Sequence, residues 1–215
     1  DQLKMNTTIA LDISQNVNLV SNAVYIITIE GVDIAGNEGA SDPIEDITFD
    51  DIPPEISIIS PSADSFINSA SLGLRTNEVL ETAVVDWIWD EGEVDPIKEH
   101  TSKLVGGSLQ DGEYPQVEFD PAPSLISGSW YNVTFHGRDR AGNSSSFNLG
   151  RLFFDNTPPE IVGKYPVSNA FINLAEISYS TNEDLSQGVL SWNPVDGSQG
   201  IEIDLISNEL NIGTF

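Results

Sequence analysis

Apolar and polar residues alternate along short segments of this chain, and turn-forming residues separate the segments. Tyr131, Val133, Phe135 and Gly137 occupy every second position of one such segment, with polar residues between them. A period of two predicts a strand with one buried face, and no stretch keeps the 3.6-residue apolar period of an amphipathic helix. The pattern therefore predicts an all-β fold.

The same strand pattern occurs twice in the chain. The segment YIITIEGVDIAGN, which begins at Tyr25, returns as YNVTFHGRDRAGN from Tyr131, 106 residues later. The segment FDDIPPEI, which begins at Phe49, returns as FDNTPPEI from Phe154, 105 residues later. A repeat of this length corresponds to one β-sandwich domain.

Positions within the repeat indicate individual strands. Tyr25 and Tyr131 have the upstream spacing of a tyrosine corner, in which a hydroxyl at the start of strand F bonds the backbone of the preceding connection. Trp87 and Trp192 fall on strand C, where sandwiches commonly bury an aromatic side chain. The chain is therefore expected to form tandem immunoglobulin-like Greek-key β-sandwiches.

Two proline pairs mark the expected domain boundaries. Pro53-Pro54 and Pro158-Pro159 each open a strand A, because proline has no amide to contribute to a central ladder. Residues 53–157 then form one complete domain. Residues 1–52 form the second half of a domain (strands E to G), and residues 158–215 form the first half of one (strands A to D).

These two halves are expected to complete each other between copies of the chain. Together, residues 158–215 and 1–52 hold 110 residues, close to the 105 from Pro53 to Pro158. The stretch from Asn208 to Asp33 through the joined ends is 41 residues, and the matching stretch from His100 to Asp139 is 40. Half cores and open strand edges are unstable alone. The sequence therefore predicts a head-to-tail filament of separate subunits or of consecutive periods of a longer protein.

Charge and composition narrow the classes of partner. The 215 residues include 34 acidic and 8 basic ones, for a net charge of -26, so a nucleic-acid backbone would be repelled. The chain has no cysteine, which excludes disulfides and thiolate sites. No apolar run approaches the about 20 residues that span a bilayer, so no membrane insertion is expected. An extracellular or cell-surface protein fits this composition.

Two motifs resemble those of the bacterial and archaeal Ig-like domain families of large extracellular surface proteins. These families have an Asp-x-Thr-Pro-Pro linker and a Gly-x-Asp-x-Ala-Gly-Asn hairpin. Residues 155–159 and 137–143 match both motifs, whereas residues 50–54 have Ile52 in place of threonine. The resemblance implies a structural repeat of an extracellular fibre, surface layer (S-layer) or adhesin.

Two other functions compete with this structural role. His100 and His136 lie in unrelated contexts, a strand C to D loop and the outward face of strand F, without a nucleophile nearby, so no enzyme is expected. A carbohydrate-binding module that takes a cell-surface glycan is the alternative, because Trp89 or Trp130 could stack on a sugar. The competing interpretation places both tryptophans in core or rim packing.

Calcium is the expected cofactor, bound where the linker meets the loops of the next domain. Acidic and amide oxygens in flexible loops suit Ca²⁺, although the same residues also cap turns. One junction would collect Asp50, Asp51, Glu78 and Asp139, and the other Asp155, Asn156, Glu183 and Asp33. Sequons at Asn6, Asn132 and Asn143 make N-glycosylation an option.

Overall fold

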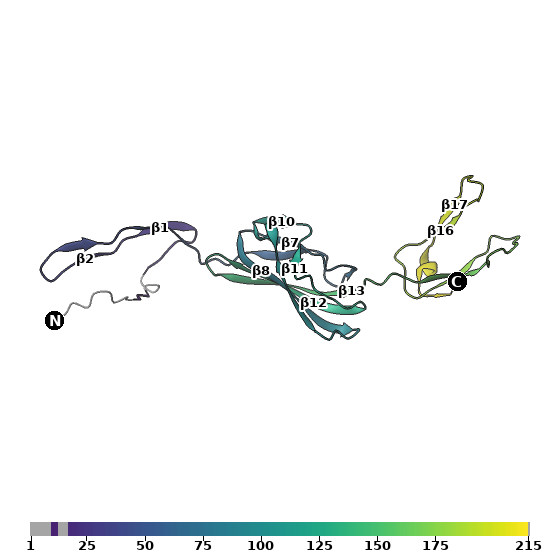
Figure 1. Ribbon diagram of the computed structural model, residues 1–215, viewed down its shortest axis with the longest axis horizontal. Helices are drawn as coiled ribbons and strands as arrows, with labels where there is room; N and C mark the ends of the chain where they lie inside the picture. The colour runs from purple at the N-terminus through teal and green to yellow at the C-terminus, as the bar shows by residue number, and fades with distance from the viewer. Residues whose placement is uncertain (1–9, 13–16, 215) are drawn as a thin grey trace. The chain divides into compact units, whose positions relative to one another are not determined.

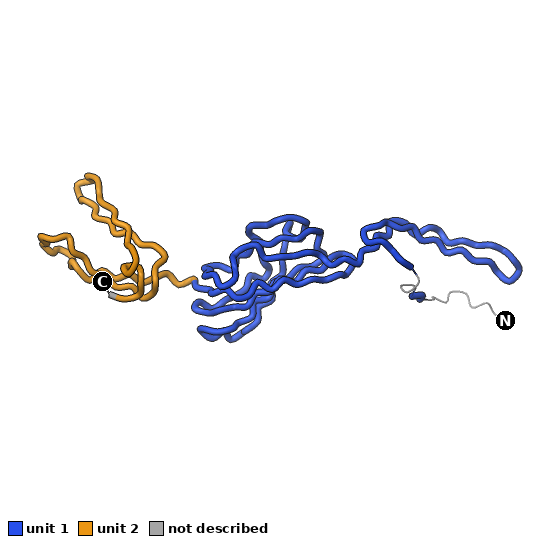
Figure 2. The backbone as a smooth tube through the Cα atoms, turned by 180° about the vertical axis from the view of Figure 1, so that it is seen from behind, with its two compact units in different colours: residues 1–155 blue, residues 156–215 orange. Residues whose placement is uncertain are grey.

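The computed structural model describes residues 10–12 and 17–214, and these residues form β-strands with two short 3-10 turns (Figure 1). The predicted all-β class is confirmed. The chain divides into two compact units, residues 1–155 and residues 156–215 (Figure 2). No helix of the described residues is long and apolar enough to cross a membrane.

Within the first unit, residues 56–154 form a complete two-layer sandwich. One layer has the strand order β10-β7-β5, and the other has the order β11-β9-β8-β12-β13-β6. The strands are β5 (Ile56–Ser60), β6 (Phe66–Ile67), β7 (Gly73–Thr76), β8 (Leu80–Gly92), β9 (Glu99–Leu104), β10 (Gly112–Tyr114), β11 (Phe119–Asp120), β12 (Ser129–Asp139) and β13 (Ser144–Phe154), with a 3-10 turn at Gly106–Leu109. In immunoglobulin lettering β5, β6, β7, β8, β9, β10, β12 and β13 are strands A, A′, B, C, C′, E, F and G.

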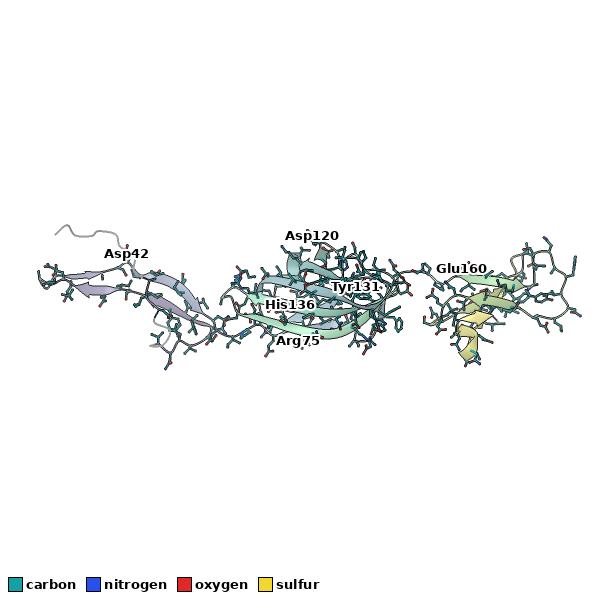
Figure 3. All side chains as sticks on the ribbon, turned by 90° about the horizontal axis from the view of Figure 1, so that it is seen from below. Asp42, Arg75, Asp120, Tyr131, His136 and Glu160 are labelled. Carbon is teal, nitrogen blue, oxygen red and sulfur yellow. The ribbon has the colours of Figure 1, made fainter. Side chains whose placement is uncertain are left out.

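The core lies between these two layers. Trp87 of β8 and Tyr131 of β12 are both 0% exposed, and Figure 3 shows Tyr131 inside the central sandwich. Along β12 every second residue is buried, from Ser129 to Asp139. The two-residue period and the assignments of strands C and F are therefore confirmed.

Before this sandwich, the described residues 10–12 and 17–52 form an F–G hairpin and no other strand. Its strands are β1 (Ala23–Ile27), β2 (Glu30–Val32), β3 (Glu38–Ala40) and β4 (Ile44–Phe49), with β1 paired to β4 and β2 to β3. Its turn repeats that of the complete domain, because Asn37 donates to both carboxylate oxygens of Asp33 as Asn143 does to those of Asp139.

The second unit holds the strands that this hairpin lacks. They are β14 (Ile161–Tyr165), β15 (Ser178–Thr181), β16 (Val189–Trp192), β17 (Ile201–Asp204) and β18 (Gly213–Thr214), with a 3-10 turn at Ser207–Leu210. β18 pairs with β15 as β10 pairs with β7, since Gly213 lies opposite Thr181 and Gly112 opposite Thr76. These strands therefore correspond to A, B, C, C′ and the start of E.

One sequence alignment was wrong. Trp192 lies opposite Ile201, as Trp87 lies opposite His100, so Ile201 and not Asn208 holds the place of His100. Counted from Ile201, the joined segment to Asp33 is 48 residues against 40 in the complete domain. The alignment was wrong because the connection between strands C and C′ is shorter in the second unit. Turn-forming residues indicate where a connection lies but do not fix its length.

Candidate functional site

An apolar groove of about 280 Å³ lies open in the second unit. Its lining includes Ile177, Tyr179, Leu185, Leu190 and Leu205. In the complete sandwich the corresponding residues are Leu72, Leu74, Leu80, Val85 and Leu104, each 5% exposed or less. The groove therefore corresponds to the B, C and C′ side of the complete sandwich core, and the described residues of the second unit form no strand F or G over it.

The F–G hairpin carries the apolar side chains of the opposite half core. Ile27, Ile29 and Ile47 are 44%, 67% and 39% exposed. Their counterparts in the complete sandwich are Val133, Phe135 and Leu152, none more than 1% exposed. Fully burying one such side chain is worth about 1.5 to 3 kcal/mol, so a partner that covered this face would be stabilised by several kcal/mol.

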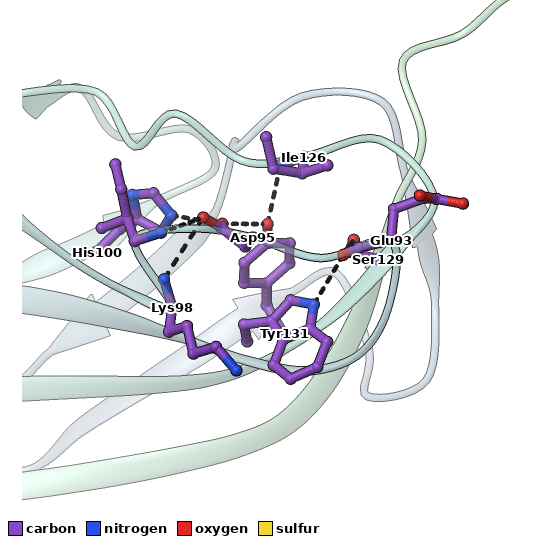
Figure 4. Close-up of polar contacts among 9 residues, drawn as sticks. Glu93, Asp95, Lys98, His100, Ile126, Ser129 and Tyr131 are labelled. Carbon is purple, nitrogen blue, oxygen red and sulfur yellow. Dashed lines mark hydrogen bonds and ion pairs between the residues drawn. The ribbon is translucent and has the colours of Figure 1, made fainter.

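A buried polar cluster closes the tyrosine corner of the complete domain (Figure 4). The Tyr131 hydroxyl accepts a hydrogen bond from the Ile126 amide at 2.8 Å and donates one to Asp95 Oδ2 at 2.6 Å. His100 Nε2 lies 2.7 Å from the same oxygen. The Tyr25 hydroxyl likewise accepts from the Val20 amide at 2.8 Å. Both predicted tyrosine corners are present.

Burial and hydrogen bonding set the pKa values in this cluster. Burial alone would raise the pKa of Asp95, but hydrogen bonds from Tyr131 and His100 outweigh it and hold the pKa at about 2. Burial and the hydrogen bond to Asp95 raise the pKa of Tyr131 to about 12. The cluster therefore holds an ionised Asp95 in the protein interior.

Sequence reasoning missed the partnership of Asp95 and His100. His100 was expected in a loop, yet it is the second residue of β9 and is 8% exposed. The signal lay in the alternation of His100, Ser102 and Leu104, which all face inward. His136 does lie on the outward side of β12, where its Nδ1 is 3.0 Å from the Ser146 hydroxyl.

Three of the predicted calcium ligands come together in the first unit. Asp50 of the linker, Glu78 of the B to C loop and Asp139 of the F–G turn each offer an oxygen, and these atoms all lie within 4.8 Å of one another. Asn143 joins the linker to this turn, because its Nδ2 donates to the Asp50 carbonyl at 3.0 Å and to Asp139 Oδ2 at 2.8 Å. Asp51 is not part of the group.

The local electrostatics of these three carboxylates differ. Burial, followed by repulsion from Asp139 and Asp50, raises the pKa of Glu78. The pKa of Asp139 is lowered, because hydrogen bonds from Asn143 and Gly142 outweigh the effect of burial. Among the described residues no Lys, Arg or His forms a salt bridge with any of the three. A cation bound between the three carboxylates would therefore relieve the repulsion that contributes to the raised pKa of Glu78.

The other predicted calcium ligands belong to different parts of the chain. Asp33 lies in the exposed turn of the N-terminal hairpin, where hydrogen bonds from Asn37 lower its pKa. Asp155 Oδ1 accepts a hydrogen bond from Ser127 in the first unit, whereas Asn156 and Glu183 belong to the second. This quartet stays a prediction.

Two of the sequons fall on described residues, and Asn6 lies outside them. Asn132 is half-buried in the middle of β12, between β8 and β13. The Nδ2 of Asn143 donates both hydrogen bonds of the junction just described. A glycan on Asn143 would have to replace these bonds, whereas Asn132 lies on the outer face of β12.

The tryptophans proposed for sugar stacking have neighbours on their rings. The Lys98 ammonium lies 4.3 Å from the ring centroid of Trp89, and the Trp89 Nε1 donates to the Glu93 carbonyl. The Arg151 guanidinium lies 4.4 Å from the ring centroid of Trp130, which also packs near Phe66 and Phe153. Both tryptophans are half-buried, as the packing interpretation requires.

Comparisons with known proteins add little to this geometry. No family model and no curated protein matches the chain, so the resemblance to bacterial and archaeal domain families stays a prediction. One similar solved structure is described as a tetra-tandem repeat in the extending region of a large adhesion protein. It has 17% sequence identity and a TM-score of 0.33, and the match covers 97% of this chain and 50% of that one. The chain thus spans about half the length of the structure it matches.

Proposed function

We propose that this chain is a structural repeat of an extracellular fibre, surface layer or adhesin, which assembles head to tail by completing a split sandwich. In this assembly the F–G hairpin of one copy fills the open groove in the second unit of another. The copies are separate subunits or consecutive periods of a longer polypeptide. Each completed junction leaves a free hairpin at one end and a free groove at the other, so the assembly continues as a filament.

The observation that carries the proposal is that the groove and the hairpin correspond to opposite sides of the core of the complete sandwich. The groove contains counterparts of the B, C and C′ core residues of the complete sandwich, and the hairpin contains counterparts of its F and G core residues. The complete sandwich also supplies a template for the strand pairing. Val133 of β12 lies opposite Trp87 of β8, so Ile27 should lie opposite Trp192 in the completed domain.

Calcium at the junction between domains forms part of the proposal. Bound to Asp50, Glu78 and Asp139, a Ca²⁺ ion would connect the linker to two loops of the next domain and remove the repulsion at Glu78. Restricting the linker in this way would stiffen a tandem array. The carboxylates would act as ligands, and the Asn143 bonds would hold the linker in place before the ion binds.

A disulfide between two copies tests the completion of the sandwich. Thr134 lies opposite Asp86 in the complete domain, so the counterparts Thr28 and Ser191 should lie opposite each other at the completed junction. Facing residues of neighbouring strands are within the Cα distance of a disulfide, and the chain has no cysteine of its own. The variant Thr28→Cys/Ser191→Cys should form a ladder of covalent oligomers under mild oxidation.

The matched control moves one cysteine to the other face of strand C. Leu190 points into the groove, whereas Ser191 points away from it, so Thr28→Cys/Leu190→Cys should form few cross-links. Equal cross-linking of the two variants, or a disulfide confined to the monomer, would contradict the proposal.

A further inference from the structure

We infer that the segment around Phe171 and Ile172 in the second unit is a latent strand A′, which forms when it pairs in parallel with β4 of a second copy. This inference rests on the proposed function and adds a second binding edge to it. The hairpin of one copy would then pair on both sides, with β16 along strand F and with residues 169–172 along strand G.

The complete sandwich shows what strand A′ does when strand G is present. β6 pairs in parallel with the end of β13, Phe66 opposite Phe153 and Ile67 opposite Phe154. The rings of Phe66 and Phe153 also pack edge to face, with centroids 5.0 Å apart. Strand A′ thus covers the outer edge of strand G.

Three backbone hydrogen bonds accompany this pairing. The Asp64 amide donates to the Arg151 carbonyl at 2.7 Å, and the amides of Phe153 and Asp155 donate to the carbonyls of Ser65 and Ile67 at 2.9 Å each. The bonds bracket β6 on both sides. They tie the A to B connection to the last strand of the domain.

The second unit repeats this segment in sequence but not in secondary structure. FIN at residues 66–68 recurs at residues 171–173, and Asn169 has a φ of 64° where Asp64 has 60°. Residues 171 and 172 nevertheless belong to no strand. Phe171 is 104% exposed and Ile172 is 37% exposed. The backbone already has the turn that leads into strand A′, and the described residues of the unit contain no strand G.

The N-terminal hairpin supplies the missing strand with the right residues. Thr48 and Phe49 of β4 correspond to Phe153 and Phe154 of β13. On this template Phe171 of one copy pairs with Thr48 of the second copy, and Ile172 pairs with Phe49 of that second copy. The amides of Thr48 and Asp50 would donate to the carbonyls of Ala170 and Ile172. The amide of Asn169 would donate to the backbone carbonyl of Asp46.

A second cysteine pair tests this edge separately from the completion of the sandwich. The variant Thr48→Cys/Phe171→Cys places its thiols at the positions of the two packed rings, Phe153 and Phe66. We expect intermolecular cross-links in at least tenfold excess over Thr48→Cys/Ile172→Cys, because neighbouring residues of a strand point to opposite faces.

The outcomes separate the two proposals. Cross-linking of Thr28→Cys/Ser191→Cys without cross-linking of Thr48→Cys/Phe171→Cys would overturn the latent strand and leave the split sandwich standing. Absence of both cross-links would overturn both. Equal cross-linking of the Phe171→Cys and Ile172→Cys variants would also overturn the latent strand, since random encounter would explain it.

Discussion

At the scale of single residues, carboxylates with similar sequence contexts have different roles. Asp139 and Asp33 belong to identical turn motifs, and asparagine hydrogen bonds lower the pKa of both. Glu78 and Glu183 likewise follow identical Thr-Asn pairs, and each threonine hydroxyl donates to the glutamate carbonyl. Only the first unit brings a turn aspartate and such a glutamate together in the described residues.

The substitution Glu78→Gln should raise the melting temperature in the presence of a chelator. A raised folded-state pKa means that the stability linked to Glu78 is present below its unfolded pKa and is lost as the pH rises through the folded one. At pH 7 glutamine removes that loss, for a gain of a few degrees. Differential scanning calorimetry with EDTA measures the change.

Calcium should reverse the order of the melting temperatures, so that the wild type becomes more stable than Glu78→Gln. The wild type should gain melting temperature with Ca²⁺, and Glu78→Gln should gain less because it loses a ligand. Glu183→Gln, studied at a concentration too low for assembly, is the matched control and should respond to Ca²⁺ like the wild type. An unchanged wild-type melting temperature on adding Ca²⁺ would count against a calcium site.

Asp95 should contribute stability through its charge. Asp95→Asn should lower the free energy of unfolding by about 2 kcal/mol at pH 7, because two hydrogen bonds to a buried ionised group are weakened. Asp86→Asn, which affects a half-buried aspartate on β8, should cost less than about 1 kcal/mol. Urea denaturation measures both losses.

The effect of Asp95 should also depend on pH with a defined sign. The folded pKa of about 2 lies below the ordinary value, so the stability linked to Asp95 is present above the ordinary value and is lost as the pH falls toward 2. The difference between wild type and Asp95→Asn should therefore shrink across that window. A difference that stays constant from pH 5 to about pH 2 would show that the charge is not responsible.

At the scale of elements, the same hairpin motif is buried in one context and open in another. The layer β10-β7-β5 covers the inner face of β12 and β13, whereas the face of β1 that holds Ile27 is open. The face of the N-terminal hairpin is open because, among the described residues, no second layer covers it. The hairpin's own sequence does not cause the exposure.

Ile29→Asp should therefore impair assembly, and Ile26→Asp should have little effect. Ile29 corresponds to Phe135 and would enter the groove, whereas Ile26 corresponds to Asn132 on the outer face. Loss of one buried isoleucine and burial of a charge should weaken association at least 100-fold. Size-exclusion chromatography at matched concentrations compares the two variants. Equal elution of both would contradict the assigned inner face.

Sequence patterns predicted the strands better than the connections between them. The period-two pattern at Tyr131 and the recurring motifs were sufficient for strands C and F. The sequence predicts strand E in residues 1–52, yet the first paired residue of strand E is Gly213. The prediction was wrong because a two-residue strand shows no alternation that a sequence pattern could reveal. Asp95 was missed because its importance comes from Tyr131, which lies 36 positions away in sequence.

The candidate site was predictable as far as local turns define it. Asp50, Glu78 and Asp139 followed from knowing which loops of a sandwich share an end. Asp51 did not join them, because its neighbour Asp50 accepts the Ser21 hydroxyl and the Ile52 amide, which fixes the direction of the linker. Such a choice between adjacent residues depends on hydrogen bonds that no sequence spacing specifies.

At the scale of the whole molecule, charge opposes the proposed assembly, whereas burial of the apolar faces would favour it. The only basic residue in residues 1–52 is Lys4, and the only one in residues 158–215 is Lys164. Both halves of the split sandwich are therefore strongly acidic. These charges would oppose the proposed assembly until salt or divalent cations screen them.

Assembly should strengthen as the salt concentration rises. The Debye length falls from about 10 Å at 0.1 M to about 3 Å at 1 M, which weakens repulsion between the two halves while apolar burial is retained. Light scattering across this range should report increasing average mass. A decrease in mass with salt would indicate that opposite charges hold the copies together.

The most direct measurement of the central claim is the sedimentation velocity of the unmodified chain across a range of concentrations at high salt. Completion of the split sandwich between copies predicts a weight-average sedimentation coefficient that rises with concentration and passes beyond that of a dimer. A single species at every concentration, whether monomer or closed dimer, would contradict head-to-tail completion.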